Sequence, residues 1–390
     1  MYTVGSSNSG VLIVTRFDCK CFKSVASLYR ASLSTLVLSL TVSLSPVWGQ
    51  TVTKLSEGFI YETAPFPSCH ASTIVQASDG TLMAAWFGGQ YEKADDVGIW
   101  FSKKLDTGWT APVELANGIQ YQWQQPVVDA KGKSWTVKRY PTWNPVLFQP
   151  KNGPLLLFYK AGPNPDNWWG MLMESKDAGK TWSQPVRLPE GILGPIKNKP
   201  IELADGTILC PTSNETPDEK DEWTVHFEST KDFGKTWTRT KPLNDPTKFG
   251  AIQPSLLQLG GDKLLAIGRS RQGSVFQMES PDAGKTWGEM SLTSLPNPNS
   301  GTDAVTLKDG RHILIYNHVT KQSMEWGGKR SPLNVAISTD GKEWKSVLEL
   351  ENEPKKEFSY PAVIQTEDGK IHVTYTWLRQ KIKHVVLELK

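Results

Sequence analysis

Residues 175–182 read Ser-Lys-Asp-Ala-Gly-Lys-Thr-Trp, and this stretch decides the fold because it recurs along the chain. Residues 230–237 and 280–287 repeat the pattern Ser/Thr-x-Asp-x-Gly-x-Thr-Trp, residues 338–344 carry a shortened copy, and residues 102–109 carry a degenerate one. These residue types suit a hairpin turn: the Asp carboxylate accepts backbone N–H bonds, the Gly adopts a positive φ, and the Trp packs beneath the turn. The pattern therefore predicts a series of similar β-hairpins.

A second turn signal alternates with this repeat. Short apolar strands flank two-residue turns that lie 48 to 73 residues apart, namely Asp79-Gly80, Asn152-Gly153, Asp205-Gly206, Gly261-Asp262, Asp309-Gly310 and Asp368-Gly369. One hairpin of each kind makes a four-stranded blade, and six blades close a ring without open edges. We therefore predict an all-β, six-bladed β-propeller over residues 50–390, with the Trp-ending repeats on the face opposite the active site. A β-sandwich is the alternative, but it does not explain why the two turn types alternate.

Residues 1–49 have the features of a targeting segment. Basic residues precede an apolar stretch at 33–44, and residues 46–49 offer a small residue for cleavage. A membrane-spanning helix needs about 20 apolar residues, so this stretch is too short to span a bilayer. We expect a cleaved signal peptide and a secreted or periplasmic protein. A disordered tail is the alternative.

The charge balance and the cysteines exclude several classes. The chain has 43 Lys and Arg against 40 Asp and Glu, a net charge of +3, which is too balanced for a nucleic-acid or acidic-membrane partner. Cys69 and Cys210 fall in predicted blades that are not neighbours, so we expect no disulfide between them. No CxxC or His/Cys cluster supports a zinc site. We expect no metal, no organic cofactor and a monomer.

A six-bladed ring with these repeats resembles the sialidase (exo-neuraminidase) family, in which the repeats are called Asp boxes or BNR repeats. The resemblance covers nearly all of residues 50–390. It implies a hydrolase of carbohydrate metabolism, an exo-acting glycosidase whose partner is an oligo- or polysaccharide with an acidic terminal sugar. Sialic acid, a related keto-sugar acid and a uronic acid all stay open.

The family binds the substrate carboxylate with three arginines. Arg269, with Arg271 beside it, and Arg330 match the second and third of these positions. His70 stands at the first, where the arginine is absent. The resemblance therefore implies that a protonated His70 helps to bind the carboxylate, and that activity falls as pH rises through its pKa. His70 is also a candidate acid or base.

The resemblance also implies the catalytic groups. The family's acid/base is an Asp on the loop after the first hairpin, which offers Asp95 and Asp96. Its nucleophile is a Tyr, and Tyr360 lies in the right strand but about two residues out of register. Gln253 occupies the place of the Glu that activates the Tyr; because a glutamine cannot take a proton, we take Gln253 as a candidate substrate-binding residue. We expect Tyr360 to converge with the candidate carboxylate-binding residues at one mouth of the central funnel.

Five further residues combine charge, amide and aromatic groups near predicted strand ends. Such groups suit sugar binding, where rings stack on aromatic faces and hydroxyls need donors and acceptors. We take them as candidate substrate-binding residues, with a purely structural role as the alternative for each: Arg139, Trp143, Asn144, Lys199 and Asp303.

Two other functions fit the same residues. In a polysaccharide lyase, His70 or Tyr360 abstracts the proton α to a uronate carboxylate while Arg269 neutralises that carboxylate. That reaction does not need the missing Glu. The third possibility is a non-catalytic propeller that binds glycans or serves as an assembly scaffold.

Overall fold

The computed structural model describes residues 51–390, except 133, 217–221 and 321–327. The expected leader at 1–49 lies outside the described residues, so it stays a prediction. Every regular element of the described part is a β-strand, and that part contains no helix that is long and apolar enough to cross a membrane.

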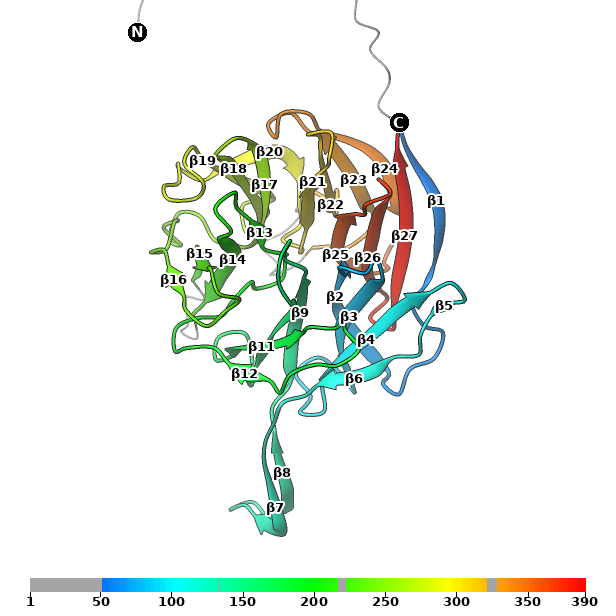
Figure 1. The fold of residues 1–390 in the computed structure, drawn as a ribbon, viewed down its shortest axis with the longest axis vertical. Coiled ribbons are helices and arrows are strands. Elements are labelled where there is room, and N and C mark those ends of the chain that lie inside the picture. Colours follow the sequence, from blue (N-terminus) through cyan, green and yellow to red (C-terminus); the bar gives the residue numbers. More distant parts are fainter. Residues whose placement is uncertain (1–50, 133, 217–221, 321–327) are drawn as a thin grey trace, which may run out of the picture. The chain divides into compact units, whose positions relative to one another are not determined.

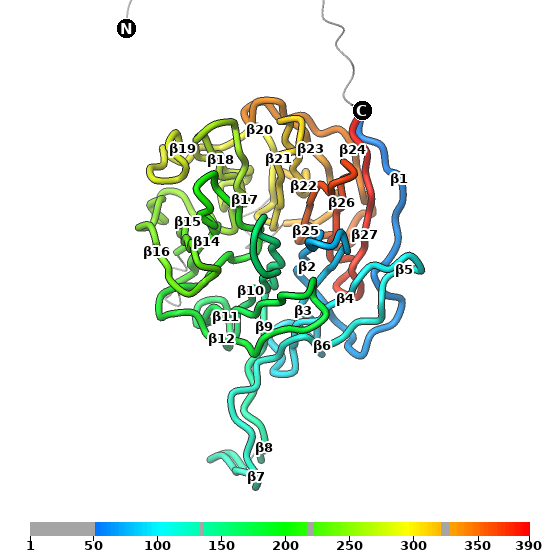
Figure 2. Tube along the Cα trace, in the orientation of Figure 1, coloured from blue at the N-terminus to red at the C-terminus, as the bar shows by residue number. Residues whose placement is uncertain are grey.

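The strands form six antiparallel sheets that follow one another around a ring (Figures 1 and 2). Blade one contains β2 (Ser68–Gln76), β3 (Leu82–Gly89), β4 (Gly98–Leu105), β5 (Gly108–Trp109) and β6 (Val113–Ala116). Blade two contains β9 (Thr142–Phe148), β10 (Leu155–Ala161), β11 (Trp169–Ser175) and β12 (Val186–Arg187). Blade three contains β13 (Ile201–Glu202), β14 (Ile208–Glu215), β15 (Trp223–Thr230) and β16 (Thr238–Arg239).

Blade four contains β17 (Ala251–Gly260), β18 (Lys263–Ser270), β19 (Ser274–Ser280) and β20 (Ser291–Pro296). Blade five contains β21 (Asp303–Thr306), β22 (His312–Tyr316), β23 (Leu333–Ser338) and β24 (Lys345–Glu351). Blade six contains β25 (Phe358–Gln365), β26 (Ile371–Trp377), β27 (Lys381–Leu389) and β1 (Val52–Phe59). Because β1 pairs with β27, the first and last strands of the described chain share one sheet and close the ring. The predicted six-bladed propeller is confirmed.

The Trp-ending repeats form the turns that their residues predict. In residues 175–182, Gly179 N–H donates to Ser175 Oγ at 2.7 Å, and Thr181 N–H donates to Asp177 Oδ1 at 2.8 Å. The Thr181 hydrogen bonds lower the pKa of Asp177 to about 2. Each full copy begins at the last residue of the third strand in its blade. The third strand of a blade runs parallel to the first, so these turns lie at the end of the ring opposite the starts of the inner strands, as predicted.

A long two-stranded ribbon is an unforeseen element. Strands β7 (Ile119–Val128) and β8 (Ser134–Arg139) pair only with each other and extend away from the blades (Figure 1). The ribbon lies between blades one and two, and it accounts for the longest interval in the series of two-residue turns.

Candidate functional site

Four inner strands carry the same β-bulge near their first residues. In each, two residues of the inner strand face one residue of the second strand, as between His70 and Thr73 in β2. The first bulged residue of each strand has a positive φ angle, which residues other than glycine rarely adopt. These residues are Ala71 (53°), Asn144 (38°), Gln253 (56°) and Tyr360 (51°). Bulges of this kind redirect a side chain and occur beside functional sites. Three of the four therefore aim a polar side chain at the same end of the ring.

This end of the ring holds a cavity of about 280 Å³, which we call the funnel pocket. The three polar bulge residues all line it, and blades one to four and blade six all contribute residues. Its lining consists of Glu92, Lys93, Trp143, Asn144, Asn164, Pro165, Asp166, Trp168, Glu215, Gln253, Arg269 and Tyr360.

Tyr360 is the centre of a dense set of contacts. Arg269 Nη1 donates a hydrogen bond to the Tyr360 hydroxyl oxygen at 2.9 Å. The Arg330 guanidinium carbon lies 5.6 Å from the Tyr360 ring centroid, and the His70 ring centroid lies 4.1 Å from it. The four residues come from blades one, four and six and from the segment before β23. The four side chains therefore gather around one ring, as expected, but only Arg269 and Tyr360 line the funnel pocket.

The groups around Tyr360 are mainly cationic. Lys197 Nζ lies 5.7 Å from its ring centroid, alongside Arg269 and Arg330. Within the described residues, Arg269 Nε is buried without a hydrogen-bond partner, and Arg330 Nη1 has no hydrogen bond but lies 3.7 Å from Glu357 Oε1. Buried donors are normally satisfied, so the open donor of Arg269, a residue of the pocket lining, favours an anionic ligand.

His70 does not bind a carboxylate as a cation, which corrects the expectation from sequence. Burial, followed by the charges of Arg379, Arg330, Lys197 and Arg269, holds the pKa of His70 well below its usual value. The imidazole is therefore neutral near pH 7. It is 2% exposed, its Nδ1 is 3.0 Å from Thr376 Oγ1, and it lies behind the Tyr360 ring rather than in the pocket lining. His70 therefore packs against the Tyr360 ring from outside the pocket lining.

Gln253 lines the funnel pocket together with Tyr360. Its backbone N–H donates to Ser213 Oγ, and its carbonyl accepts from Asn198 Nδ2 at 3.0 Å. Its side-chain Oε1 is buried and has no partner among the described residues. An amide oxygen in this position accepts a hydrogen bond but removes no proton.

The two aspartates proposed as acid/base lie outside the funnel pocket, which corrects a second expectation. Asp95 and Asp96 are exposed, and the Asp96 carboxylate accepts the N–H of Gln90 at 3.2 Å. This hydrogen bond closes their loop onto itself. The same loop places Glu92 in the pocket instead, and Asp166 and Glu215 supply two more carboxylates there.

Lys199 and Asp303 form a buried structural ion pair rather than a sugar-binding pair. Lys199 Nζ lies 2.8 Å from Asp303 Oδ2. The Asp303 carboxylate also accepts the Ser255 hydroxyl and the N–H groups of Ala304 and Val363. Its lone pairs are therefore used in joining blades four, five and six.

The remaining candidates divide into two groups. Trp143 and Asn144 line the funnel pocket as expected. Arg139 instead donates to the Asp96 carbonyl and to Glu114 Oε1, which ties the base of the ribbon to blade one. Arg271 stacks at 4.0 Å on the Trp223 ring outside the pocket lining.

Comparison with known sequences identifies the family. A family of BNR repeat-like domains matches residues 80–373, which is more than half of the chain. The chain belongs to the BNR repeat-like domain family. A sialidase of Bacteroides fragilis is similar to it, 27% identical over 205 residues, which cover 45% of this chain and 36% of that protein. The match thus spans little more than a third of the relative's length.

Solved structures agree on the fold of this BNR repeat-like chain. A protein of unknown function from Dyadobacter fermentans has a TM-score of 0.68 at 18% identity, covering 87% of this chain and 99% of that one. The NanB sialidase of Streptococcus pneumoniae has a TM-score of 0.64 at 13% identity, covering 85% of this chain and 70% of that one. The chain thus shares the propeller fold of these structures.

Sequence reasoning missed a third arginine at the site of this BNR repeat-like domain. Arg379, in the turn between β26 and β27, donates from Nε to Glu357 Oε1 and from Nη1 to Glu92 Oε2, each at 2.7 Å. It is the largest charged influence on His70. A turn residue between two late strands gave no signal of its own, because only ring closure brings blade six beside blade one.

Lys197 is a second residue near the site that the sequence analysis did not single out. Its Nζ donates to the carbonyls of Thr302 and Pro361 and to Asn198 Oδ1, so one cation joins blades five and six to the segment before blade three. Burial lowers the pKa of Lys197 to about 7. A usable sequence signal did exist for the bulges: Asn, Gln and Tyr each precede a proline inside an apolar strand, and proline lacks the N–H that a ladder needs.

Proposed function

We propose that this chain is an exo-acting glycoside hydrolase that releases a terminal acidic sugar from a glycan. One observation carries the proposal: the Arg269 guanidinium and the Tyr360 hydroxyl are hydrogen-bonded to each other at the wall of the funnel pocket. A carboxylate held by Arg269 would place the rest of its sugar ring beside the phenol oxygen. The sialidase named among the relatives supports the same reaction class.

The pocket supplies the parts that glycoside hydrolysis requires. Arg269, assisted by the charge of Arg330, binds the carboxylate. The Tyr360 oxygen faces the anomeric carbon, where it attacks or stabilises positive charge as the bond to the leaving oxygen breaks. A carboxylic acid must protonate that leaving oxygen. The candidates for this role are Glu92, Asp166 and Glu215, which line the pocket.

This geometry allows the phenol proton of Tyr360 to be transferred. An arginine is a donor only, so Arg269 occupies a lone pair of the Tyr360 oxygen and leaves the phenol proton free to point elsewhere. Because Gln253 cannot accept that proton, it passes to water or to a pocket carboxylate. This step is where the chain departs most from the tyrosine–glutamate arrangement expected of a sialidase.

Gln253 also favours a second candidate, a polysaccharide lyase. In that reaction a base removes the proton α to a uronate carboxylate while an arginine neutralises the carboxylate, and no tyrosine–glutamate pair is needed. The cations around Tyr360 suit this chemistry as well. The two reactions give different products, because only hydrolysis adds water.

Export belongs to the same proposal. The basic and apolar pattern of residues 1–49 supports a cleaved signal peptide and a secreted or periplasmic enzyme acting on glycans outside the cell. Sequencing the N-terminus of the protein recovered from its producing cell tests this: a mature start near residue 50 supports export, and an intact residue 1 opposes it.

A panel of acid-terminated glycans tests the proposed reaction. It should include terminal sialic acid, another keto-sugar acid and uronic acids, with products identified by mass. Release of a saturated monosaccharide acid supports the hydrolase. An unsaturated uronide, detected by its ultraviolet absorbance, supports the lyase instead. Saturable binding without any product would show a glycan-binding propeller and overturn the enzymatic proposal.

A further inference from the structure

Two of the bulges at the funnel pocket belong to blades that blade five separates. Gln253 and Pro254 form the bulge of β17 in blade four, and Tyr360 and Pro361 form the bulge of β25 in blade six. A bulge disrupts the ladder of backbone hydrogen bonds. Gln253 and Tyr360 also have positive φ angles, which persist only where surrounding contacts hold them. Both bulges therefore need support from outside their own blades.

One buried pair of side chains connects these two bulges. Lys197 Nζ donates to the Pro361 carbonyl at 2.7 Å and to Asn198 Oδ1 at 2.7 Å. Asn198 Nδ2 in turn donates to the Gln253 carbonyl at 3.0 Å. Lys197 is 5% exposed and Asn198 is 1% exposed, so water hardly competes for these bonds. A continuous row of hydrogen bonds thus runs from blade six to blade four.

We propose that Lys197 and Asn198 act as one positioning pair that fixes the place of Tyr360 in the funnel pocket. This inference rests on the proposed function and deepens it, because it names residues that act through the tyrosine without touching substrate. The described lining of the funnel pocket includes neither member of the pair. Their influence on the reaction is therefore carried by the two bulges.

The pair is complete only while Lys197 carries its charge. In addition to its bonds to Pro361 and Asn198, Lys197 Nζ donates to the Thr302 carbonyl at 2.9 Å. An ammonium group has three N–H groups and all three are used here, whereas a neutral amine has only two. The ammonium therefore holds the backbone beside Tyr360 rather than the phenol itself.

Close packing also confines the Tyr360 ring beside Lys197. A Cβ atom added at Gly301 would lie 3.2 Å from Lys197 Cε and 3.3 Å from Cδ2 of the Tyr360 ring. Glycine is the residue that permits so close an approach of backbone, lysine side chain and ring. A shift of the lysine would therefore change the space available to the ring.

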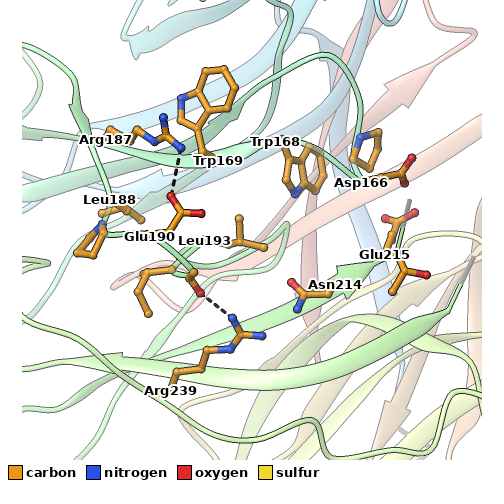
Figure 3. A pocket seen from close by; sticks show the side chains of 15 residues that line it. Asp166, Trp168, Trp169, Arg187, Leu188, Glu190, Leu193, Asn214, Glu215 and Arg239 are labelled. Atoms are coloured by element: carbon orange, nitrogen blue, oxygen red, sulfur yellow. Dashed lines mark hydrogen bonds and ion pairs between the residues drawn. The ribbon is translucent and has the colours of Figure 1, made fainter. Parts of the chain in front are cut away.

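The chain directly before the pair is itself held in place. Arg239 Nη1 donates to the Gly191 carbonyl at 2.7 Å (Figure 3). Glu228 is fully buried, and its carboxylate accepts the Gly194 N–H at 2.6 Å. These contacts fix the loop that leads to Lys197. A positioning pair needs such support, because a side chain can hold another group only as firmly as its own backbone is held.

Substitutions in the pair test the inference by kinetics on one acidic glycoside. Lys197→Met removes the three donors and keeps the length of the side chain. We expect kcat to fall at least tenfold while KM changes less than threefold, because Arg269 still binds the carboxylate. Asn198→Leu should lower kcat in the same way. The double variant should be no worse than the more impaired single variant, since either change breaks the same row of bonds.

The matched control is Lys383→Met, which removes a lysine of β27 that is ion-paired with Glu351. Its side chain is 14% exposed, and it lies outside the lining of the funnel pocket. This variant should lose stability, as measured by thermal unfolding, and keep the kcat and KM of the wild type. It thus separates the loss of a partly buried lysine from the loss of the positioning pair.

Fluorine NMR of protein that contains 3-fluorotyrosine reports on Tyr360 without any substrate. The signal that disappears in Tyr360→Phe is the signal of Tyr360 among the 10 tyrosines of the chain. We expect it to shift or broaden in Lys197→Met and also in Asn198→Leu, although Asn198 bonds to Gln253 and reaches Tyr360 only through Lys197. It should stay unchanged in Lys383→Met.

The outcomes separate this inference from the proposed function. If the wild type cleaves no acidic glycan, the proposed function fails, and the fluorine signal alone decides whether the pair positions Tyr360. Wild-type kcat with an unchanged signal in both single variants would overturn the inference, as would an equal loss of kcat in Lys383→Met. Losses that multiply in the double variant would also overturn it, because the two residues would then act independently.

A milder variant keeps the inference testable if Lys197→Met does not fold. Asn198→Asp keeps an acceptor for Lys197 but removes the donor to the Gln253 carbonyl. A lowered kcat and a shifted Tyr360 signal in this variant support the positioning pair, and wild-type values of both contradict it.

Discussion

Arg269 Nη1 donates a hydrogen bond of 2.9 Å to the hydroxyl of Tyr360, although the two residues are 91 positions apart in the sequence. Arg269 comes from the end of β18 in blade four, and Tyr360 comes from the bulge of β25 in blade six. Blades four and six are not neighbours in the ring, so their strands can meet only near its axis. The contact therefore places the two groups most characteristic of an acidic-sugar hydrolase at one wall of one pocket.

Arg269→Gln should weaken substrate use much more than Arg271→Gln. Both guanidinium groups stack on the Trp223 ring, at 5.0 and 4.0 Å, but only Arg269 lines the funnel pocket. A charge-assisted hydrogen bond contributes about 1.5–3 kcal/mol, so kcat/KM should fall roughly 10- to 100-fold for Arg269→Gln. Steady-state kinetics on one acidic substrate measure this. Equal losses in the two variants would mean that Trp223 stacking, not carboxylate binding, is what matters.

Tyr360→Phe should lower kcat by about 10²- to 10⁴-fold, the range for loss of a group that takes part in the chemical step. The phenyl ring keeps the contact with the His70 ring at 4.1 Å, so the variant should fold and bind substrate with a similar KM. Near-unchanged kcat would remove Tyr360 from the chemistry. Thermal unfolding of the same sample confirms that any loss is not a loss of fold.

The fold was predictable because its signals are local. A carboxylate, a glycine and a tryptophan at fixed spacing specify a turn whatever surrounds them, as the Asp177 and Thr181 contacts show. The site was predictable only in part. Tyr360 is two residues out of the expected register, and the bulge in β25 inserts an extra residue between Ser359 and Ala362. A bulge of this kind shifts the residue number that occupies a given place in the strand, although the strand itself lies where it was predicted.

Properties that depend on packing could not be read from the sequence. His70 has the residue type of an acid/base, but its neutral state follows from burial behind Tyr360 and from nearby cations. The sequence marks Asp303 as a polar residue that could bind a sugar, but in the structure its carboxylate oxygens already accept hydrogen bonds from the protein. Arg379 reaches the site only because ring closure brings its turn to Glu92. Each case requires the three-dimensional neighbours of one side chain.

Asp303→Asn should destabilise the protein strongly. It leaves Lys199 without its buried counter-charge, and breaking a buried ion pair by removing one partner costs about 3–5 kcal/mol. The control is Asp309→Asn, which disrupts the more exposed pair with Arg311 and should cost less than about 1 kcal/mol. Urea unfolding gives both free energies. A small loss for Asp303→Asn together with a raised KM would return Asp303 to the substrate-binding set.

Stability should decline as pH falls from 7 to 5. Burial lowers the pKa of His70 well below 6.5, of His372 to about 4 and of His384 to about 3. In the unfolded chain these three histidines take up protons below about pH 6.5, whereas in the folded protein they stay neutral. Each of them therefore lowers the free energy of unfolding by about 2 kcal/mol at pH 5 and has almost no effect above pH 7. The free energy of unfolding across this range measures the effect. His384→Gln should flatten the decline, and an identical slope would show that His384 titrates normally.

The most direct test of the account uses a pair of glycosides that differ only at the carboxyl group of the terminal sugar. One carries the carboxylate, and in the other that group is reduced to a primary alcohol. The account predicts that wild-type protein releases the saturated sugar acid from the first, with kcat/KM at least 100-fold above that for the second, because only the carboxylate engages Arg269 beside Tyr360. Equal cleavage of both glycosides would contradict the claim that the funnel pocket recognises an acidic sugar.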